Sequence, residues 1–368
     1  MSDSLDRLFK KFTEKKAVHS ALLRIEAENG DVIWSGAYGN DSPEGRLMDP
    51  GHSYFIASAT KIFTAVSVLK LHESGKLDLS TPAISILPEL TEIHNYKGVD
   101  HTDEIRVFHL LSHTSGLPDY FEQAGTGKDS LLTQLLNGGD RSWDTEFVLQ
   151  RARSMKPPFP PATKEGSKNK AHYSDTNYQI LDLLIERITG QSPVEALASL
   201  ADSLGLRRTY MYDHSNAAEA GADQAGDTDE PVKPVPCLFY YGNRCLAMPQ
   251  AMRSFRGDGA AVSTTADQIR FLRSLFLEGL LRPETLERMQ QWNRIFFPFR
   301  YGMGLMQFQL PAILTGFRRM PEFIGHSGAS GAINFYCPER KVFVAGTFNQ
   351  LKDRSLPFQW MARAVGLL

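Results

Sequence analysis

Ser58 and Lys61 are residues whose types and spacing could carry out nucleophilic catalysis. An apolar run from Tyr54 to Ala57 leads into Ser58, and a helical pattern of apolar residues begins directly after Lys61. Residues three apart on a helix lie on one face, and a helix start offers unpaired N–H groups and a positive partial charge. A lysine whose pKa is lowered by burial could therefore accept the proton of Ser58.

The S-x-x-K spacing alone is a weak signal, because the chain contains it three times. Ser67 precedes Lys70 on the same expected helix, but at about 100° per residue it lies near the opposite face from Ser58. Ser167 precedes Lys170 in a polar, lysine-rich segment with no helix start. The strand-like entry and helical exit make Ser58 the candidate nucleophile.

Two later segments could complete such a site. Tyr173 stands just before an expected helix that Ser174 or Asp175 could cap, which would leave its phenol free to point into a cleft. Ordinary packing with a satisfied hydroxyl is the alternative. The glycine-rich segment 325–332 lies at an expected strand, where it would let backbone N–H groups approach a substrate closely.

Other patterns support competing chemistry less well. Gly-His-Ser-Gly-Ala at 325–329 nearly matches the G-x-S-x-G nucleophile elbow, but no histidine follows His326 to complete that triad. His109 and His113 stand four apart and could in principle share a metal, yet no H-E-x-x-H pattern or third ligand accompanies them. We expect these two histidines to serve helix packing and capping.

The three segments, taken in order, resemble the signatures of the serine β-lactamase and penicillin-binding-protein superfamily, which are S-x-x-K, Y-x-N, and K-T-G or H-T-G. The chain is most similar to the class C β-lactamase-type branch, with its D-alanyl-D-alanine carboxypeptidases, D-aminopeptidases and esterases. The resemblance covers roughly residues 18 to 350. The matching stretches are Ser58-x-x-Lys61, Tyr173-Ser174-Asp175, His326-Ser327-Gly328, 55–61, 110–117 and 178–190.

The resemblance implies catalytic roles for four residues. Ser58 attacks a carbonyl and becomes acylated, while Lys61 and Tyr173 share the proton transfer. The backbone N–H groups of Ser58 and Ala329 form the oxyanion hole. Water then releases the acyl group, and the resemblance implies no metal and no cofactor.

The resemblance also implies that Asp175, His326, Ser327 and Gly328 bind substrate, and two of them depart from the family pattern. Asp175 replaces the asparagine of Y-x-N, so an amide that can donate a hydrogen bond becomes an acceptor, with negative charge beside Lys61. His326 replaces the lysine of K-T-G and removes a permanent positive charge. Both changes favour a neutral acyl substrate such as a short-chain ester, although the histidine variant also occurs in peptidases of this family.

Composition bounds the class of protein. The 368 residues are 42% hydrophobic and 22% charged, with a formal net charge of −2 and a pI of about 6.6, so no basic surplus indicates nucleic-acid binding. Three cysteines without C-x-x-C spacing favour neither a disulfide framework nor a zinc site. No run is long enough to span a bilayer and no secretory signal is seen, so we expect a cytoplasmic protein.

The elements that position the site are expected at both ends of the chain. The pattern predicts an α/β (α+β) fold, with an antiparallel sheet made from N- and C-terminal strands, flanked by terminal helices, and a large, mostly helical insertion. Asn29-Gly30 predicts a hairpin. The sheet subdomain would comprise 1–56 plus 296–368 and the helical subdomain 57–295, with the active site between them. The expected strands are 20–26, 31–38, 301–309, 332–336 and 342–348, and the expected terminal helices are 1–16 and 354–365.

The sequence therefore predicts a serine hydrolase that works through an acyl-enzyme on Ser58, with a carboxylesterase or small-amide hydrolase favoured. A β-lactamase or a D-amino-acid-specific peptidase is the alternative within the same chemistry. A non-catalytic scaffold or binding protein is the alternative from another class. The expected partner is a small-molecule ester, amide or β-lactam-like substrate, and the oligomeric state is left open.

Overall fold

The computed structural model describes residues 2–125, 127, 129–166, 168–213, 235–311, 313 and 319–368. The segment 214–236, expected to form a surface loop or lid, lies outside these residues except for its last two positions.

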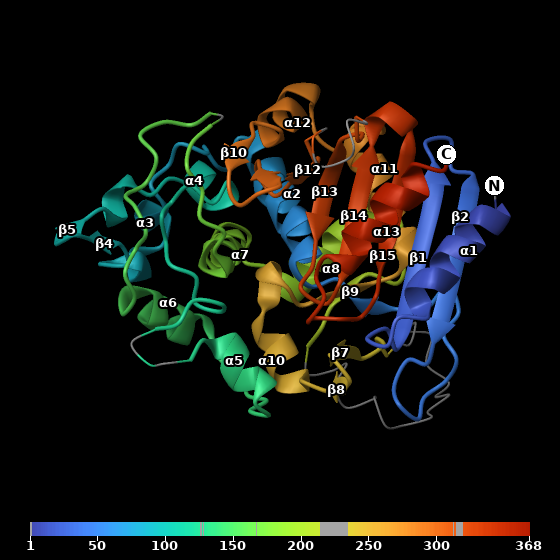
Figure 1. Ribbon diagram of the computed structural model, residues 1–368. Coiled ribbons are helices and arrows are strands. Elements are labelled where there is room, and N and C mark those ends of the chain that lie inside the picture. The colour runs from blue at the N-terminus through green and yellow to red at the C-terminus, as the bar shows by residue number, and fades with distance from the viewer. Residues whose placement is uncertain are drawn as a thin grey trace, which may run out of the picture.

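An eight-stranded antiparallel sheet unites the two ends of the chain (Figure 1). Strands from the N-terminus occupy one edge, and strands from the C-terminal third make up the rest. In the order in which they lie side by side, the strands are β10 (Asn293–Arg294), β11 (Phe299–Tyr301), β12 (Met306–Phe308), β13 (Phe323–Ser327), β14 (Ala332–Cys337), β15 (Val342–Thr347), β1 (Ser20–Ala27) and β2 (Val32–Gly39).

Strand β1 joins the two parts of this sheet. It pairs with β2 through the predicted hairpin, where Gly30 adopts a φ of +95° that suits the tight turn. On its other side it pairs with β15, with Leu22 opposite Thr347. The predicted sheet from both termini is therefore confirmed.

The terminal helices cover one face of the sheet (Figure 1). Helices α1 (Ser2–Thr13) and α13 (Leu356–Val365) lie side by side there and pack apolar side chains against the strands. Trp360 is fully buried in this layer. Helix α11 (Thr265–Phe276) contacts β1, β14 and β15, and Figure 1 shows it behind the sheet, on the face opposite to α1 and α13.

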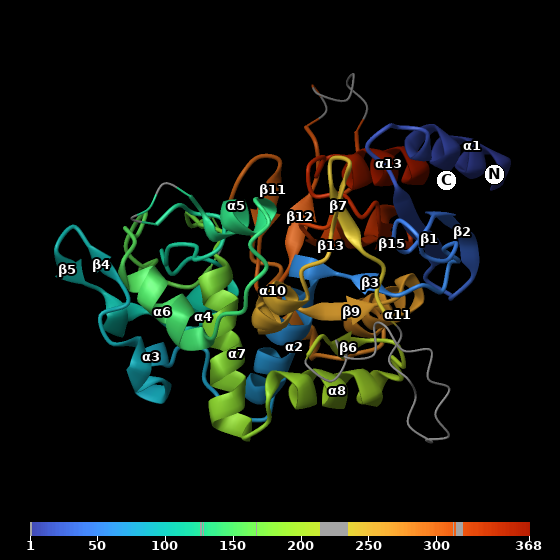
Figure 2. The ribbon, with the colours of Figure 1, turned by 90° about the horizontal axis from the view of Figure 1, so that it is seen from below.

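The middle of the chain is mostly helical, as expected, but it also contains short strands. Strands β3 (Tyr54–Phe55), β9 (Ala261–Ser263) and β6 (Tyr210–Met211) form a small antiparallel sheet beside α2 (Figure 2). Two further two-stranded sheets are β4 (Asn95–Tyr96) with β5 (Val99–Asp100), and β7 (Phe239–Tyr241) with β8 (Arg244–Leu246). The helices are α2 (Thr60–Glu73), α3 (Ala83–Ile86), α4 (Val107–Leu111), α5 (Leu131–Leu136), α6 (Thr145–Arg153), α7 (Asp175–Thr189), α8 (Pro193–Leu204), α10 (Pro249–Ser254) and α12 (Pro283–Met289).

The single strand predicted over 301–309 is wrong in detail, because the chain turns between β11 and β12. Gly304 adopts a φ of +73°, and a Cβ there would lie 2.3 Å from Ala65 Cβ of α2. A Cβ on Gly302 would lie 1.8 Å from the carbonyl oxygen of Met289. The two glycines thus allow a turn pressed against the helices, which alternation of apolar residues did not reveal.

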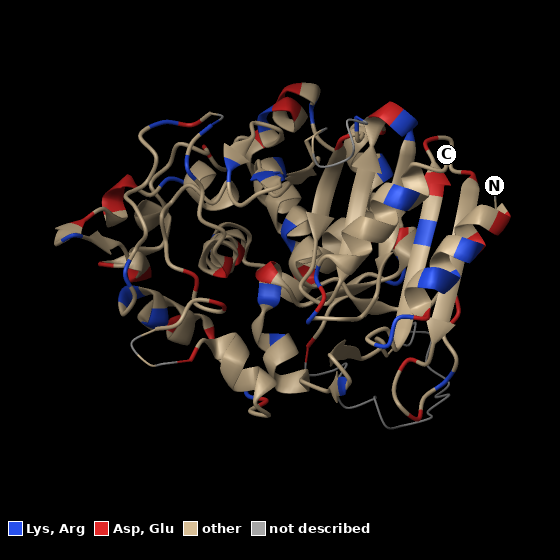
Figure 3. Cartoon of the chain, in the orientation of Figure 1, with Lys and Arg blue, Asp and Glu red and all other residues tan. Residues whose placement is uncertain are grey.

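The predicted fold class, mixed helices with antiparallel sheets, is confirmed. The division into a sheet subdomain and a helical subdomain stays an interpretation. Acidic and basic residues are interspersed along both regions (Figure 3). Among the described helices, none combines the length and apolar character needed to cross a bilayer.

Candidate active site

Ser58 lies in a short 3-10 turn, Ala57–Ala59, that links β3 to α2. Ala57 adopts a φ of +47°, a strained region for a residue with a side chain. The turn is anchored by the Thr60 hydroxyl, which donates to the Ala57 carbonyl over 2.7 Å. Ser58 is only partly buried, so its hydroxyl stands at the start of α2 within reach of solvent.

Lys61 is fully buried one turn beyond Ser58, and its ammonium group has three close oxygen partners. Its Nζ lies 3.1 Å from Ser58 Oγ, 2.6 Å from the carbonyl oxygen of Asp258 and 2.7 Å from Asp175 Oδ1. A lysine ammonium has three N–H donors. Two of these contacts are hydrogen bonds and the third is an ion pair with Asp175, so the surroundings favour the charged form of Lys61.

The expectation that burial lowers the pKa of Lys61 is not met. Burial alone would lower it, but the negative charge of Asp175, followed by Tyr173 and Asp258, raises the pKa above its ordinary value. Lys61 is consequently a cation in the resting site and donates a hydrogen bond to Ser58. Proton removal has to begin from this charged state.

Tyr173 stands beside these residues, with its ring centroid 5.1 Å from Lys61 Nζ. Burial raises the pKa of its phenol above the ordinary value. The charge of Lys61 opposes this rise, and so do hydrogen bonds from the side chains of Ser58 and Lys61. The structure thus brings Ser58, Lys61 and Tyr173 together.

Helix α7 begins directly after Tyr173, but neither residue expected to cap it does so. The Ser174 hydroxyl donates to the carbonyl of Pro118, and no side chain of α7 caps its start. Asp119 does this instead, because its Oδ1 accepts from the Asp175 N–H over 2.9 Å. Burial and the nearby charge of Asp175 raise the pKa of Asp119 to about 7.

The loop between β13 and β14 closes over the Ser58 turn. A Cβ on Gly328 would lie 2.4 Å from the carbonyl oxygen of Ile56, so only glycine allows this approach. The Ser330 hydroxyl donates to the carbonyl of Phe55 over 3.0 Å. In the part of the chain that the structure describes, neither the Ser58 nor the Ala329 N–H donates to a backbone carbonyl. Both groups are available as oxyanion donors.

His326 is fully buried and does not present a ring nitrogen to the cleft. Its Nδ1–H donates to the carbonyl of Ser327 over 2.7 Å, and its Nε2 lies 3.0 Å from the hydroxyl oxygen of Tyr301. Burial and the charge of Lys61 lower the pKa of His326 to about 3. The ring is therefore neutral, whereas Ser327 and Gly328 remain partly exposed.

Sequence reasoning did not identify Asp258 or Asp119 as neighbours of the site. Asp258 lies in the small-residue segment 257–265, for which no chemical role was found, yet its carbonyl binds Lys61. Its carboxyl accepts from the Tyr120 hydroxyl over 2.9 Å, and burial raises its pKa well above the ordinary value. Asp119 lies two residues beyond the stretch 110–117 that resembles the family, and this position in the sequence was a usable signal.

Two residues of the competing motifs, Ser67 and His109, lie outside this group of residues. Ser67 lies further along α2, and Ser167 lies outside the described residues. His109 places Nδ1 2.9 Å from the backbone N of Arg106 and Nε2 2.7 Å from the Ala162 carbonyl. His109 thus packs and caps as predicted, and no cluster of metal ligands is present among the described residues.

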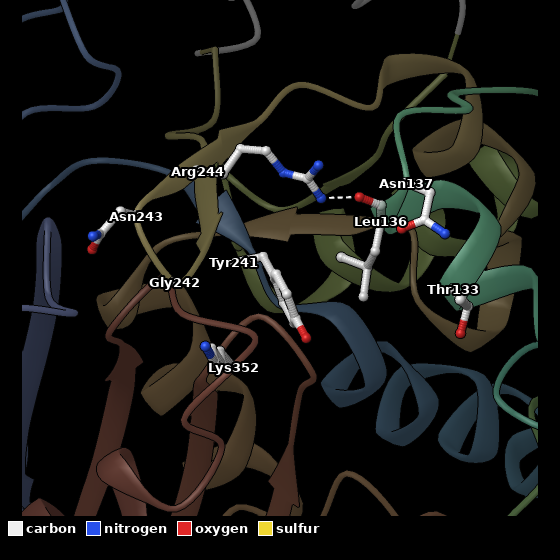
Figure 4. Close-up of a pocket in the computed structure, with 8 residues that line it drawn as sticks. All are labelled: Thr133, Leu136, Asn137, Tyr241, Gly242, Asn243, Arg244 and Lys352. Carbon is white, nitrogen blue, oxygen red and sulfur yellow. Dashed lines mark hydrogen bonds between the residues drawn. The ribbon is translucent and has the colours of Figure 1, made fainter.

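A separate open pocket of about 750 Å³ lies between α5, the β7–β8 hairpin and the segment after β15 (Figure 4). None of its lining residues belongs to the candidate site. Arg244 donates to the carbonyl of Leu136 across this pocket, and Lys352 Nζ lies 6.0 Å from the ring centroid of Tyr241.

A sheet built from both termini, with a helical region starting at a serine turn, is the architecture of serine hydrolases related to β-lactamases and penicillin-binding proteins. The chain belongs to the beta-lactamase family, whose model matches residues 5–368. It is 25% identical over 339 residues to penicillin-binding protein 4* of Bacillus subtilis (strain 168), covering 88% of this chain and 66% of that protein. It is 28% identical over 237 residues to protein flp of Staphylococcus aureus (strain N315), covering 62% of this chain and 43% of that protein. The chain thus spans less than two thirds of the length of these relatives.

Solved structures share the fold over nearly the whole chain. The D-amino acid amidase from Ochrobactrum anthropi SV3 superposes with a TM-score of 0.75 at 19% identity, covering 99% of this chain and 100% of that one. EstCE1, described as a hydrolase with promiscuous acyltransferase activity, gives a TM-score of 0.73 at 20% identity, with 99% and 97% covered. The octameric penicillin-binding protein homologue from Pyrococcus abyssi gives 0.75 at 24% identity, with 99% and 76% covered.

Proposed function

We propose that this protein is a carboxylesterase or small-amide hydrolase that acts on neutral acyl substrates through an acyl-enzyme on Ser58. Ser58, Lys61 and Tyr173 are the proposed catalytic side chains. The N–H groups of Ser58 and Ala329 are the proposed oxyanion hole.

The observation that carries the substrate preference is the absence of a free cation among the described residues at the site. Lys61 is paired with Asp175 at 2.7 Å, and His326, at the position of the family's lysine, is buried and neutral. A substrate carboxylate beside Ser58 would meet the negative charge of Asp175 without a compensating partner. A neutral ester or amide avoids that repulsion.

The proposed reaction has two stages. The Lys61–Tyr173 pair first loses one proton to solvent. Ser58 Oγ then forms a bond to the substrate carbonyl carbon while its proton passes to that pair, and the Ser58 and Ala329 N–H groups stabilise the oxyanion. The carbonyl then re-forms, the bond to the leaving group breaks, and the pair returns the proton to that group. In the second stage water forms a bond to the acyl carbon and gives a proton to the pair. The bond between Ser58 Oγ and the acyl carbon then breaks, the pair returns the proton to Ser58, and the acid leaves.

Hydrolysis of p-nitrophenyl acetate and butyrate by the wild type and by Ser58→Ala tests this proposal. We expect turnover by the wild type and loss of at least about 1,000-fold in the variant, because the nucleophile is removed. Equal rates in the two proteins would contradict Ser58 as the nucleophile. Circular dichroism and thermal melting of both proteins check that the comparison concerns chemistry rather than folding.

Acylation by a fluorescent penicillin separates the alternatives. Rapid labelling of Ser58 and release of the opened ring would instead support a β-lactamase, while cleavage of D-amino-acid amides or D-alanyl peptides in preference to esters would support the peptidase alternative. If the protein turns over none of these substrates and does not react with a fluorophosphonate probe, the non-catalytic alternative is favoured.

A further inference from the structure

His113 is a fully buried residue that the proposed reaction does not use, although it contacts Tyr173 directly. It follows α4 in the S-H-T-S-G segment and adopts a φ of +58°, where a non-glycine residue is strained. Such strain persists only where the surrounding contacts impose it. The contacts of His113 converge on the three residues around the phenol.

His113 binds the backbone on both sides of Tyr173. Its carbonyl accepts from the His172 N–H over 2.9 Å, and its ring Nδ1 accepts from the Ser174 N–H over 3.3 Å. The imidazole ring packs against the phenol ring between these two bonds, with centroids 4.5 Å apart. One residue thus holds both flanking peptide groups and one side of the Tyr173 ring.

A second hydrogen bond fixes the orientation of the imidazole. Asn177 Nδ2 lies 3.0 Å from His113 Nδ1 and also donates to the Ser174 carbonyl over 3.3 Å. The Ser115 hydroxyl donates to Asn177 Oδ1 over 2.6 Å, so the amide directs an N–H at the ring. With two donors facing it, Nδ1 is the acceptor and the proton resides on Nε2. Tyr178 and Tyr301 pack on the ring as well, with centroids 5.2 and 4.4 Å away.

We infer that His113 is a positioning residue that holds the Tyr173 hydroxyl at Ser58 and Lys61, an inference that rests on the function proposed above. Its effect on the reaction passes through Tyr173, because its ring nitrogens contact neither the nucleophile nor Lys61 among the described interactions. Loss of this support would let the phenol move, and a displacement of about 1 Å can reduce a rate about 100-fold.

His113→Asn is the most informative substitution, since asparagine tolerates a positive φ and keeps an acceptor for the Ser174 and Asn177 donors while removing the ring. We expect p-nitrophenyl ester turnover and the rate of Ser58 labelling by a fluorophosphonate probe to fall about 10- to 100-fold. In a Tyr173→Phe background the same substitution should cost less than about threefold, because the hydroxyl that His113 positions is already gone. An equal loss in both backgrounds, or no loss in the first, would overturn the inference.

His109→Asn is the matched control. His109 is almost as buried, lies in the preceding helix α4 and binds the Ala162 carbonyl rather than the Tyr173 region. We expect it to lower the melting temperature but to change the labelling rate of folded protein by less than about twofold. If His113→Asn does not fold, Asn177→Ala serves in its place, because it removes the donor that orients the His113 ring. The fall in turnover caused by Asn177→Ala should likewise be smaller in the Tyr173→Phe background.

The outcomes distinguish this inference from the proposed function. Activity that survives Ser58→Ala contradicts the proposed function. Suppose instead that Ser58→Ala has no ester turnover and Tyr173→Phe has reduced turnover. If His113→Asn then lowers the rate equally in the wild-type and Tyr173→Phe backgrounds, the proposed function stands and only the positioning role is overturned.

Discussion

At the scale of single residues, the protonation state of Lys61 governs how the site can work. Its ammonium is surrounded by acceptors and paired with Asp175, so the resting site holds one more proton than the attack by Ser58 allows. Raising the pH removes that proton. Activity should therefore rise with pH, and its ascending limb should lie on the alkaline side because the pKa values of Lys61 and Tyr173 are both raised.

Asp175→Asn tests this reasoning, because it removes the negative charge that contributes most to raising the pKa of Lys61. A lower pKa means that the active, deprotonated form appears at lower pH. We expect the ascending limb of kcat/KM against pH to move down by about one to three units. Asp6→Asn is the control, since Asp6 on α1 accepts a hydrogen bond from Trp34 of β2 and does not belong to the site. If the ascending limb of kcat/KM stays at the same pH in Asp175→Asn, a group other than Lys61 determines the pH dependence.

The sequence located Ser58, Lys61 and Tyr173 because each belongs to a short motif with fixed spacing. It could not reveal that Asp258 binds Lys61, because their hydrogen bond joins residues 197 positions apart and involves a backbone carbonyl. It also could not reveal that His326 is buried and neutral, since a replacement within a motif does not show which neighbours enclose the new ring. The role of His113 was hidden for the same reason.

At the scale of elements, the site is formed where the β13–β14 loop contacts the Ser58 turn. Their contact depends on Gly328, which lies against the carbonyl of Ile56, and on the Ser330 hydroxyl at Phe55. The spacing of the two proposed oxyanion donors therefore depends on both a glycine and a hydrogen-bonding side chain.

We expect Gly328→Ala to reduce kcat by at least about 10-fold while the protein stays folded, because a Cβ 2.4 Å from the Ile56 carbonyl forces the loop away from Ser58. KM should change less than kcat, since the donors act mainly in the transition state. Gly127→Ala, where a Cβ would meet nothing within 4 Å, is the control. Steady-state ester kinetics on both variants give the comparison, and an unchanged kcat would contradict a tight loop contact.

Long or strongly patterned elements were predictable, whereas short ones were not. The terminal helices and the β1–β2 hairpin followed from apolar periodicity and Asn29-Gly30. The two-residue strands β6 and β10 contain too few residues to show a period of apolar residues. The cap of α7 also escaped prediction, because Asp119 reaches it from another segment.

At the scale of the whole molecule, the sheet and its terminal helices support the site from a distance. Trp360 of α13 is fully buried against the sheet. We expect Trp360→Ala to lower the free energy of unfolding by about 3–5 kcal/mol, as large-to-small core substitutions do. Denaturant titration measures this loss, and kcat/KM per folded molecule should stay within about twofold. A large fall in activity of the folded variant would show that α13 also shapes the site.

The pairing of β1 with β15 has a kinetic consequence. Asn349, just beyond β15, donates a hydrogen bond to Ser20 at the start of β1, and 329 positions of chain separate them. Contacts this distant in sequence form slowly, because a long loop must close before they stabilise anything. During synthesis, the edge of β1 that pairs with β15 stays unpaired until almost the whole chain has left the ribosome. The proposed site should therefore assemble only at the end of folding, with the first large strand exposed to aggregation until then.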